Sequence, residues 1–110
     1  MRSRLMDDLA DIDGVEWVAL IGADALTIEH SPPSEQGENA AAMWIALESR
    51  AEVLLGGVPE KFTLGSDKAI MLSHRLDNDH VVLMRASPNS NIGKLRKALS
   101  DASERIKDLL

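Results

Sequence analysis

The stretch Glu35–Leu55, with the sequence EQGENAAAMWIALESRAEVLL, contains the strongest helical pattern in the chain. Ser34 precedes it and can cap a helix, and two glutamates in the first turn lie where the helix dipole favours negative charge. Gly56-Gly57 and then Pro59 are typical of a helix end. We therefore predict one helix from Glu35 to Leu55.

Two apolar stripes run along this predicted helix when its residues are placed at about 100° each. The broader stripe is suited to pack on a sheet and consists of Ala40, Met43, Trp44, Leu47, Ala51, Leu54 and Leu55. The second stripe lies on the far side, is made mostly of small residues, and consists of Ala42, Ile45, Ala46, Ser49 and Val53. A helix that is apolar on two sides needs two partners. In a chain this short, the simplest second partner is another copy of the same chain.

The composition is that of one globular domain, which we expect to span residues 1–110. The net charge of −6 argues against binding of nucleic acid or of an anionic membrane surface, both of which require a basic face. The absence of cysteine excludes disulfides and thiolate metal sites. Neither a signal peptide nor an apolar run of about 20 residues is visible, so we expect no membrane insertion and a cytoplasmic protein.

The flanking segments predict two further helices and five strands. We expect helices over 3–12 and from Ile92 to the end, and strands over 15–21, 26–30, 61–65, 69–76 and 80–86. Strands 15–21 and 80–86 are apolar on both sides and should lie centrally, whereas Leu26 and Ile28 should mark the inner side of their strand. Gly14 suits a left-handed helix stop. The order αββαβββα predicts an α+β domain with an antiparallel sheet covered on both faces.

Possible ligands gather at one predicted hairpin, where His74 and His80 flank Asp77 and Asp79. One interpretation is a zinc or hard-metal site. The other is a solvated hairpin tip, because aspartate and asparagine tolerate turn geometry. We favour the tip and expect no metal. His30 stands alone at a strand end and is expected at the surface.

The remaining sequence motifs do not predict a set of catalytic residues. The chain has no G-x-S-x-G nucleophile elbow and no phosphate-binding G-x-x-x-x-G-K-[ST] loop. The run Gly93–Lys97 is basic and begins a helix, where it is either an anion site or a solvated helix face. Trp17 is expected in the core, and Trp44 either in the core or against a partner, the core being favoured. We therefore expect neither an enzyme nor a cofactor.

The chain resembles the roadblock / dynein light chain domains in the order of its elements. The resemblance also rests on Ile12-Asp13-Gly14-Val15 before the first strand, on an alanine-rich central helix ending in glycine, and on Asn91-Ile92-Gly93-Lys94-Leu95-Arg96 at the start of the last helix. One departure is Asp24-Ala25, where the family often has Asp-Gly, because alanine is disfavoured at positive φ.

The resemblance implies a five-stranded antiparallel sheet of the profilin and longin type. It also implies a homodimer in which the central helices pack together and the third strands pair edge to edge. We therefore predict a dimer interface formed by Ala42, Ile45, Ala46, Ser49, Val53, Phe62, Thr63 and Leu64. Family members are dynein subunits, anchoring components, and activators or platforms of small Ras-like GTPases, so a small GTPase is the partner that the resemblance implies.

Two alternatives remain. The same sheet could carry a small-ligand sensor or enzyme, for which a polar pocket near His74, Arg75 and His80 would be the evidence. A longin-type adaptor would instead bind heteromeric partners.

Overall fold

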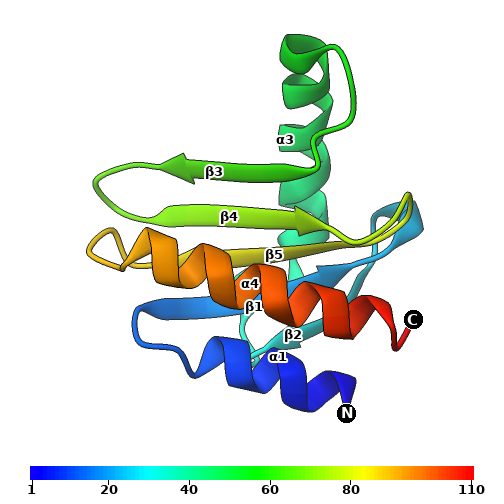
Figure 1. The fold of residues 1–110 in the computed structure, drawn as a ribbon. Helices are drawn as coiled ribbons and strands as arrows, with labels where there is room; N and C mark the ends of the chain where they lie inside the picture. The colour runs from blue at the N-terminus through cyan, green and yellow to red at the C-terminus, as the bar shows by residue number, and fades with distance from the viewer.

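The computed structural model describes residues 1–110, apart from the side chain of Ala25. The elements are α1 (Arg2–Ala10), β1 (Val15–Ile21), η1 (Ala23–Ala25), β2 (Thr27–Ser31), α2 (Glu35–Glu38), α3 (Ala40–Leu55), β3 (Lys61–Gly65), β4 (Ile70–Arg75), β5 (Val81–Ala86) and α4 (Ile92–Lys107). Within this described part, the strands form one five-stranded sheet in the order β2-β1-β5-β4-β3, and each neighbouring pair is antiparallel. The predicted α+β class and element order are confirmed (Figure 1).

Helices cover both faces of the sheet, as the sequence predicts. On one face α1 and α4 pack over a core that includes Met6, Leu95 and Ile106, all of them fully buried. On the other face α2 and α3 pack over a smaller core around Trp17 and Trp44. Strands β1 and β5 are central because their side chains are apolar on both faces, and each of them is buried along most of its length. No described helix has the length and apolar character needed to cross a bilayer.

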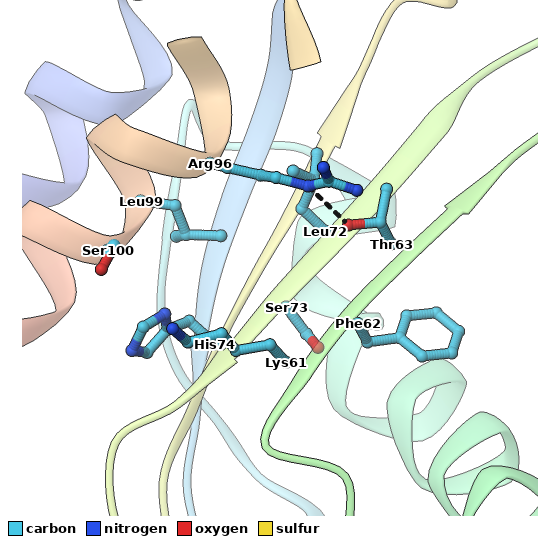
Figure 2. A pocket seen from close by; sticks show the side chains of 9 residues that line it. All are labelled: Lys61, Phe62, Thr63, Leu72, Ser73, His74, Arg96, Leu99 and Ser100. Atoms are coloured by element: carbon cyan, nitrogen blue, oxygen red, sulfur yellow. Dashed lines mark hydrogen bonds between the residues drawn. The ribbon is translucent and has the colours of Figure 1, made fainter. Parts of the chain in front are cut away.

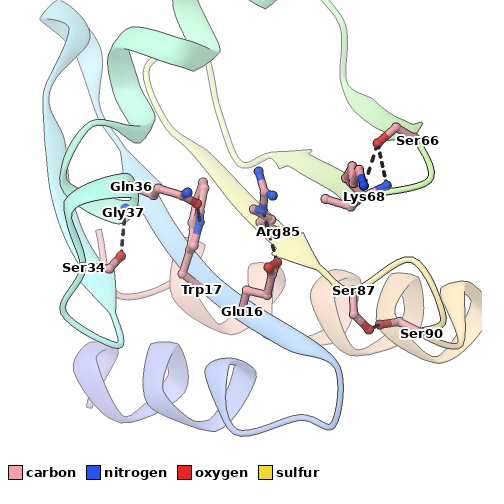
Figure 3. Close-up of polar contacts among 11 residues, drawn as sticks. Glu16, Trp17, Ser34, Gln36, Gly37, Ser66, Lys68, Arg85, Ser87 and Ser90 are labelled. Carbon is pink, nitrogen blue, oxygen red and sulfur yellow. Dashed lines mark hydrogen bonds and ion pairs between the residues drawn. The ribbon is translucent and has the colours of Figure 1, made fainter.

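The prediction of one continuous helix from Glu35 to Leu55 is wrong. The chain leaves helical geometry at Asn39, which separates α2 from α3. Each segment is fixed to the sheet by its own hydrogen bond. In α2, Gln36 Oε1 accepts from Trp17 Nε1 at 3.0 Å, and in α3 the Ala41 amide donates to Thr27 Oγ1 at 3.1 Å. Ser34 caps α2 as predicted by accepting from the Gly37 amide (Figure 3).

The broader stripe of α3 is only partly buried. Ala40, Trp44 and Ala51 are buried, but Met43, Leu54 and Leu55 are exposed, contrary to the prediction. Leu54 and Leu55 are exposed because α3 runs past β3, the last strand of the sheet, so its final turn has no sheet beneath it (Figure 1). The helix ends as predicted, at Gly56 with φ of 76°.

The first hairpin also differs from the prediction. Leu26 precedes β2 and is exposed in the turn, and Ile28 is exposed because β2 is an edge strand that α2 and α3 cover only in part. The positive φ of this turn falls on Asp24, at 61°, and aspartate tolerates that region. The prediction that Gly14 stops the first helix is wrong, because α1 already ends at Ala10 with Asp11 as its C-cap; Gly14, with a φ of 93°, lies in the turn before β1.

Candidate interaction surface

The outward side of α3 is an exposed apolar surface. All five residues of the second stripe are exposed, and the exposed fraction of Val53 reaches 83%. Leu64, a predicted interface residue, is exposed beside this surface, and sequence reasoning missed four further exposed neighbours that extend it: Met43, Leu54, Leu55 and Val58. Periodicity alone does not show where the sheet ends under a helix, so no local signal could have assigned them.

The edge strand β3 borders this surface. Thr63 and Leu64 are exposed, and β4 is the only strand paired with β3 in the described part of the chain. Phe62 differs from the other predicted interface residues because it is half-buried in its own chain. Its ring meets the ring of Trp44 edge to face, with centroids 6.1 Å apart. Trp44 itself is in the core, as favoured from the sequence.

An ion pair holds α3 in place against the end of β4. Arg75 Nη2 lies 2.7 Å from Glu48 Oε1, and Arg75 Nε donates to the Pro59 carbonyl at 3.1 Å. One side chain thus joins α3, β4 and the segment that leads into β3. Because both partners are mostly shielded from solvent, the pair fixes the orientation of α3 and with it the exposed apolar surface.

The hairpin tip between β4 and β5 is a hydrogen-bonded turn. Asp77 accepts from the Asp79 amide at 2.8 Å, and His80 Nδ1 lies 2.9 Å from Asp77 Oδ1. Desolvation raises the pKa of Asp77, but these hydrogen bonds and the charge of His80 outweigh it, so the pKa is lowered. Among the described residues, no three His, Asp or Glu side chains are grouped as a metal would require.

His74 does not join this tip. It is buried on the α4 side of the sheet, where desolvation and then the charge of Lys61 lower its pKa, while Glu104 acts in the opposite direction. The expectation that His30 lies at the surface is wrong, since it is half-buried against α2. A Cβ placed at Gly37 would lie 2.9 Å from His30 Nδ1, which shows how closely α2 and β2 approach.

Two hollows lie beside His74. One of about 390 Å³ is lined by Glu60, Lys61, His74, Arg75, Leu76, Asp77, Asn78, Ser100 and Glu104. The other is a groove of about 160 Å³ between α4 and β3, shown in Figure 2. His80 lines neither of them, so the structure brings His74 and Arg75 together but not all three residues of the predicted polar pocket.

Neither a family model nor a curated protein matches the sequence of this chain. Solved structures do match its fold. A Roadblock/LC7 domain from Streptomyces avermitilis superposes with a TM-score of 0.83 at 14% identity, covering 97% of this chain and 95% of that one. The gliding protein MglB from Thermus thermophilus gives 0.81 at 14% identity, covering 99% and 90%. A structure described as MglB with a tetrameric arrangement gives 0.83 at 11% identity, covering 97% and 85%. The chain therefore has the fold of the Roadblock/LC7 domains.

Proposed function

We propose that this protein is a non-enzymatic, homodimeric scaffold or regulator that acts on a small Ras-like GTPase in the cytoplasm, with residues 1–110 forming one domain. The observation that carries the proposal is the exposed apolar surface of α3 beside the edge strand β3. Exposed apolar side chains gathered on one helix are typical of a protein–protein interface. The resemblance to roadblock domains supplies the GTPase as the partner.

Self-association is the part of the proposal that the surface itself supports best. Ala42, Ala46 and Ser49 are small and exposed, so a second helix can approach α3 closely. Ile45 and Val53 flank them and would become buried on association. The edge of β3 provides unpaired backbone groups that a second β3 can satisfy.

The proposed dimer has a simple geometry. Two β3 strands pair antiparallel about a two-fold axis at Thr63, the middle residue of the strand, and the two sheets become one. The α3 helices then pack against each other on one face of this joint sheet. The tetrameric arrangement of an MglB with the same fold supports the idea that such domains self-associate.

Sedimentation velocity tests the dimer. We expect a mass twice the 12.0 kDa of the chain at micromolar concentration. A monomer at that concentration would contradict self-association.

The regulatory role requires a second measurement, in which candidate small GTPases from the same genome are loaded with GTP or GDP and mixed with the protein. We expect nucleotide-dependent binding or faster GTP hydrolysis, and failure with every candidate would overturn the GTPase assignment alone.

A small-ligand sensor is the second candidate, favoured by the polar hollow of about 390 Å³ beside His74 and Arg75. This volume lies within the range of small-molecule sites, which is about 300–1,000 Å³. A thermal-shift measurement with nucleotides and divalent metals separates the two candidates. A rise in melting temperature that grows with ligand concentration would support the sensor.

A further inference from the structure

The groove between α4 and β3 exists because the two faces of the edge strand are covered differently. On one face α3 passes over β3 and Phe62 packs beneath it. On the other face α4 lies over the middle of the sheet and leaves the β3 side chains Lys61 and Thr63 exposed (Figure 2). The uncovered strip between helix and edge strand is the groove of about 160 Å³.

Strand register decides what the groove contains. Lys61 pairs with His74 and Thr63 pairs with Leu72, so these four side chains share the face that is turned toward α4. Leu72 and Leu99 are buried at its base. Arg96 reaches across from α4, and its Nε donates to Thr63 Oγ1 at 3.3 Å (Figure 2).

The two cations of the groove lack a direct ion-pair partner within the described chain, although Glu60 and Glu104 line the adjoining hollow with Lys61. Neither Lys61 nor Arg96 belongs to any ion pair found among the described residues, although Lys97, one residue further along α4, pairs with Asp101. Both side chains are exposed, and the Nη groups of Arg96 keep their donors available. Two unpaired cations beside one groove stand out in a chain whose net charge is −6.

The size and lining of the groove limit the class of ligand. Its volume is about half the lower end of the range for small-molecule sites, so it fits a single side chain better than a metabolite. The aliphatic stems of Lys61 and Arg96 extend the apolar base made by the two leucines. A bare inorganic anion would make no favourable contact with this apolar base. An apolar side chain flanked by carboxylates would contact both the apolar base and the two cations.

We propose that this groove binds an acidic peptide segment of a partner protein, with one apolar side chain of the peptide resting on Leu72 and Leu99 while neighbouring carboxylates pair with Lys61 and Arg96. The groove lies on the opposite face of the sheet from α3. Its occupation therefore leaves the exposed surface of α3 free, although β3 borders both the groove and the edge that pairs in the proposed dimer.

A selection from a random dodecapeptide display library on the immobilised protein tests this proposal, because such a library needs no identified partner. We expect enrichment of peptides in which aspartate or glutamate flanks an apolar residue. Enrichment of basic or neutral peptides, or no enrichment, would overturn the proposal.

Variants then locate the binding site. A fluorescein-labelled copy of the most enriched peptide is titrated by anisotropy against the wild type, Lys61→Glu, Arg96→Glu and the control Lys107→Glu. The control reverses a charge on the same helix about 16 Å along its axis. We expect each groove variant to weaken binding about tenfold or more and the control to change it less than twofold.

Retained binding by both groove variants would overturn the assignment of the site. Lys61→Ala and Arg96→Ala serve as milder substitutions, and circular dichroism confirms that each variant is folded. Inorganic phosphate is added as a competitor. If it displaces the peptide at concentrations as low as the peptide's own Kd, the groove is a simple anion site and the peptide proposal is wrong.

Discussion

Arg75 Nη2 lies 2.7 Å from Glu48 Oε1, and this contact ties the last residue of β4 to the middle of α3. The exposed fractions of the two side chains are only 13% and 23%, so solvent screens the pair weakly. The same guanidinium group holds the carbonyl of Pro59, just before β3. Together with the packing of Trp44 on Phe62, this pair of residues thus fixes the orientation of the exposed α3 surface relative to the edge strand.

Removing one partner of this pair should destabilise the protein. We expect Glu48→Ala to lower the free energy of unfolding by about 1–3 kcal/mol, because it leaves Arg75 mostly buried without its anion. Urea denaturation measures the change. Lys97→Ala is the control, since its pair with Asp101 is exposed and should contribute less than about 1 kcal/mol. Equal effects of the two variants would contradict the anchoring role of Arg75.

A charge on the outward face of α3 should separate the proposed dimer without unfolding the chain. Ile45→Glu and Ala46→Glu each place a carboxylate where the second helix would pack, and burial of an unpaired carboxylate is costly. We expect the monomer mass by sedimentation together with an unchanged circular dichroism spectrum. The control Ser3→Glu changes an exposed residue of α1 and should remain dimeric. Unfolding of the α3 variants would show instead that this stripe belongs to the core of the single chain.

Substitution by alanine should have opposite effects on the free energy of unfolding at two glycines, Gly14 and Gly57. Gly14 has a φ of 93°, and a Cβ there would overlap Ser90 Oγ, so Gly14→Ala should cost about 1–3 kcal/mol. Gly57 has no atom within 4 Å of the position of a Cβ and lacks a positive φ, so Gly57→Ala should be neutral or stabilise by up to about 1 kcal/mol. Thermal unfolding of both variants tests the pair, and a loss of similar size at both glycines would be inconsistent with this geometry.

Stability should fall as the pH drops below 6.5 because of His74. Burial lowers the pKa of its imidazole in the folded chain below the ordinary value of 6.5, so the unfolded chain binds more protons in that window. The destabilisation begins near pH 6.5 and grows until the pH reaches the pKa of the folded state. Denaturant midpoints measured between pH 8 and pH 5 test this, with His74→Gln as the comparison. A wild type and variant with the same pH dependence would show that His74 is not responsible.

The sequence of this protein determined its fold class, because local patterns carry that information. The apolar character of both sides of 15–21 and 80–86 places β1 and β5 at the centre of the sheet, and Ser34 and Gly56 act as the cap and the stop that their chemistry suggests. The small residues of the second stripe of α3 were also identifiable, since helical periodicity alone separates them from the buried side.

Which parts of each element are covered depends on contacts between segments that are distant in the sequence. The break at Asn39 accompanies hydrogen bonds to Trp17 and Thr27, residues distant in the sequence. Leu54 is exposed since the sheet ends at β3 before α3 does. Strand register and the path of α4 likewise bring Lys61 and Arg96 to one groove. Burial depends on where neighbouring elements end in space, and a pattern within one segment contains no information about that.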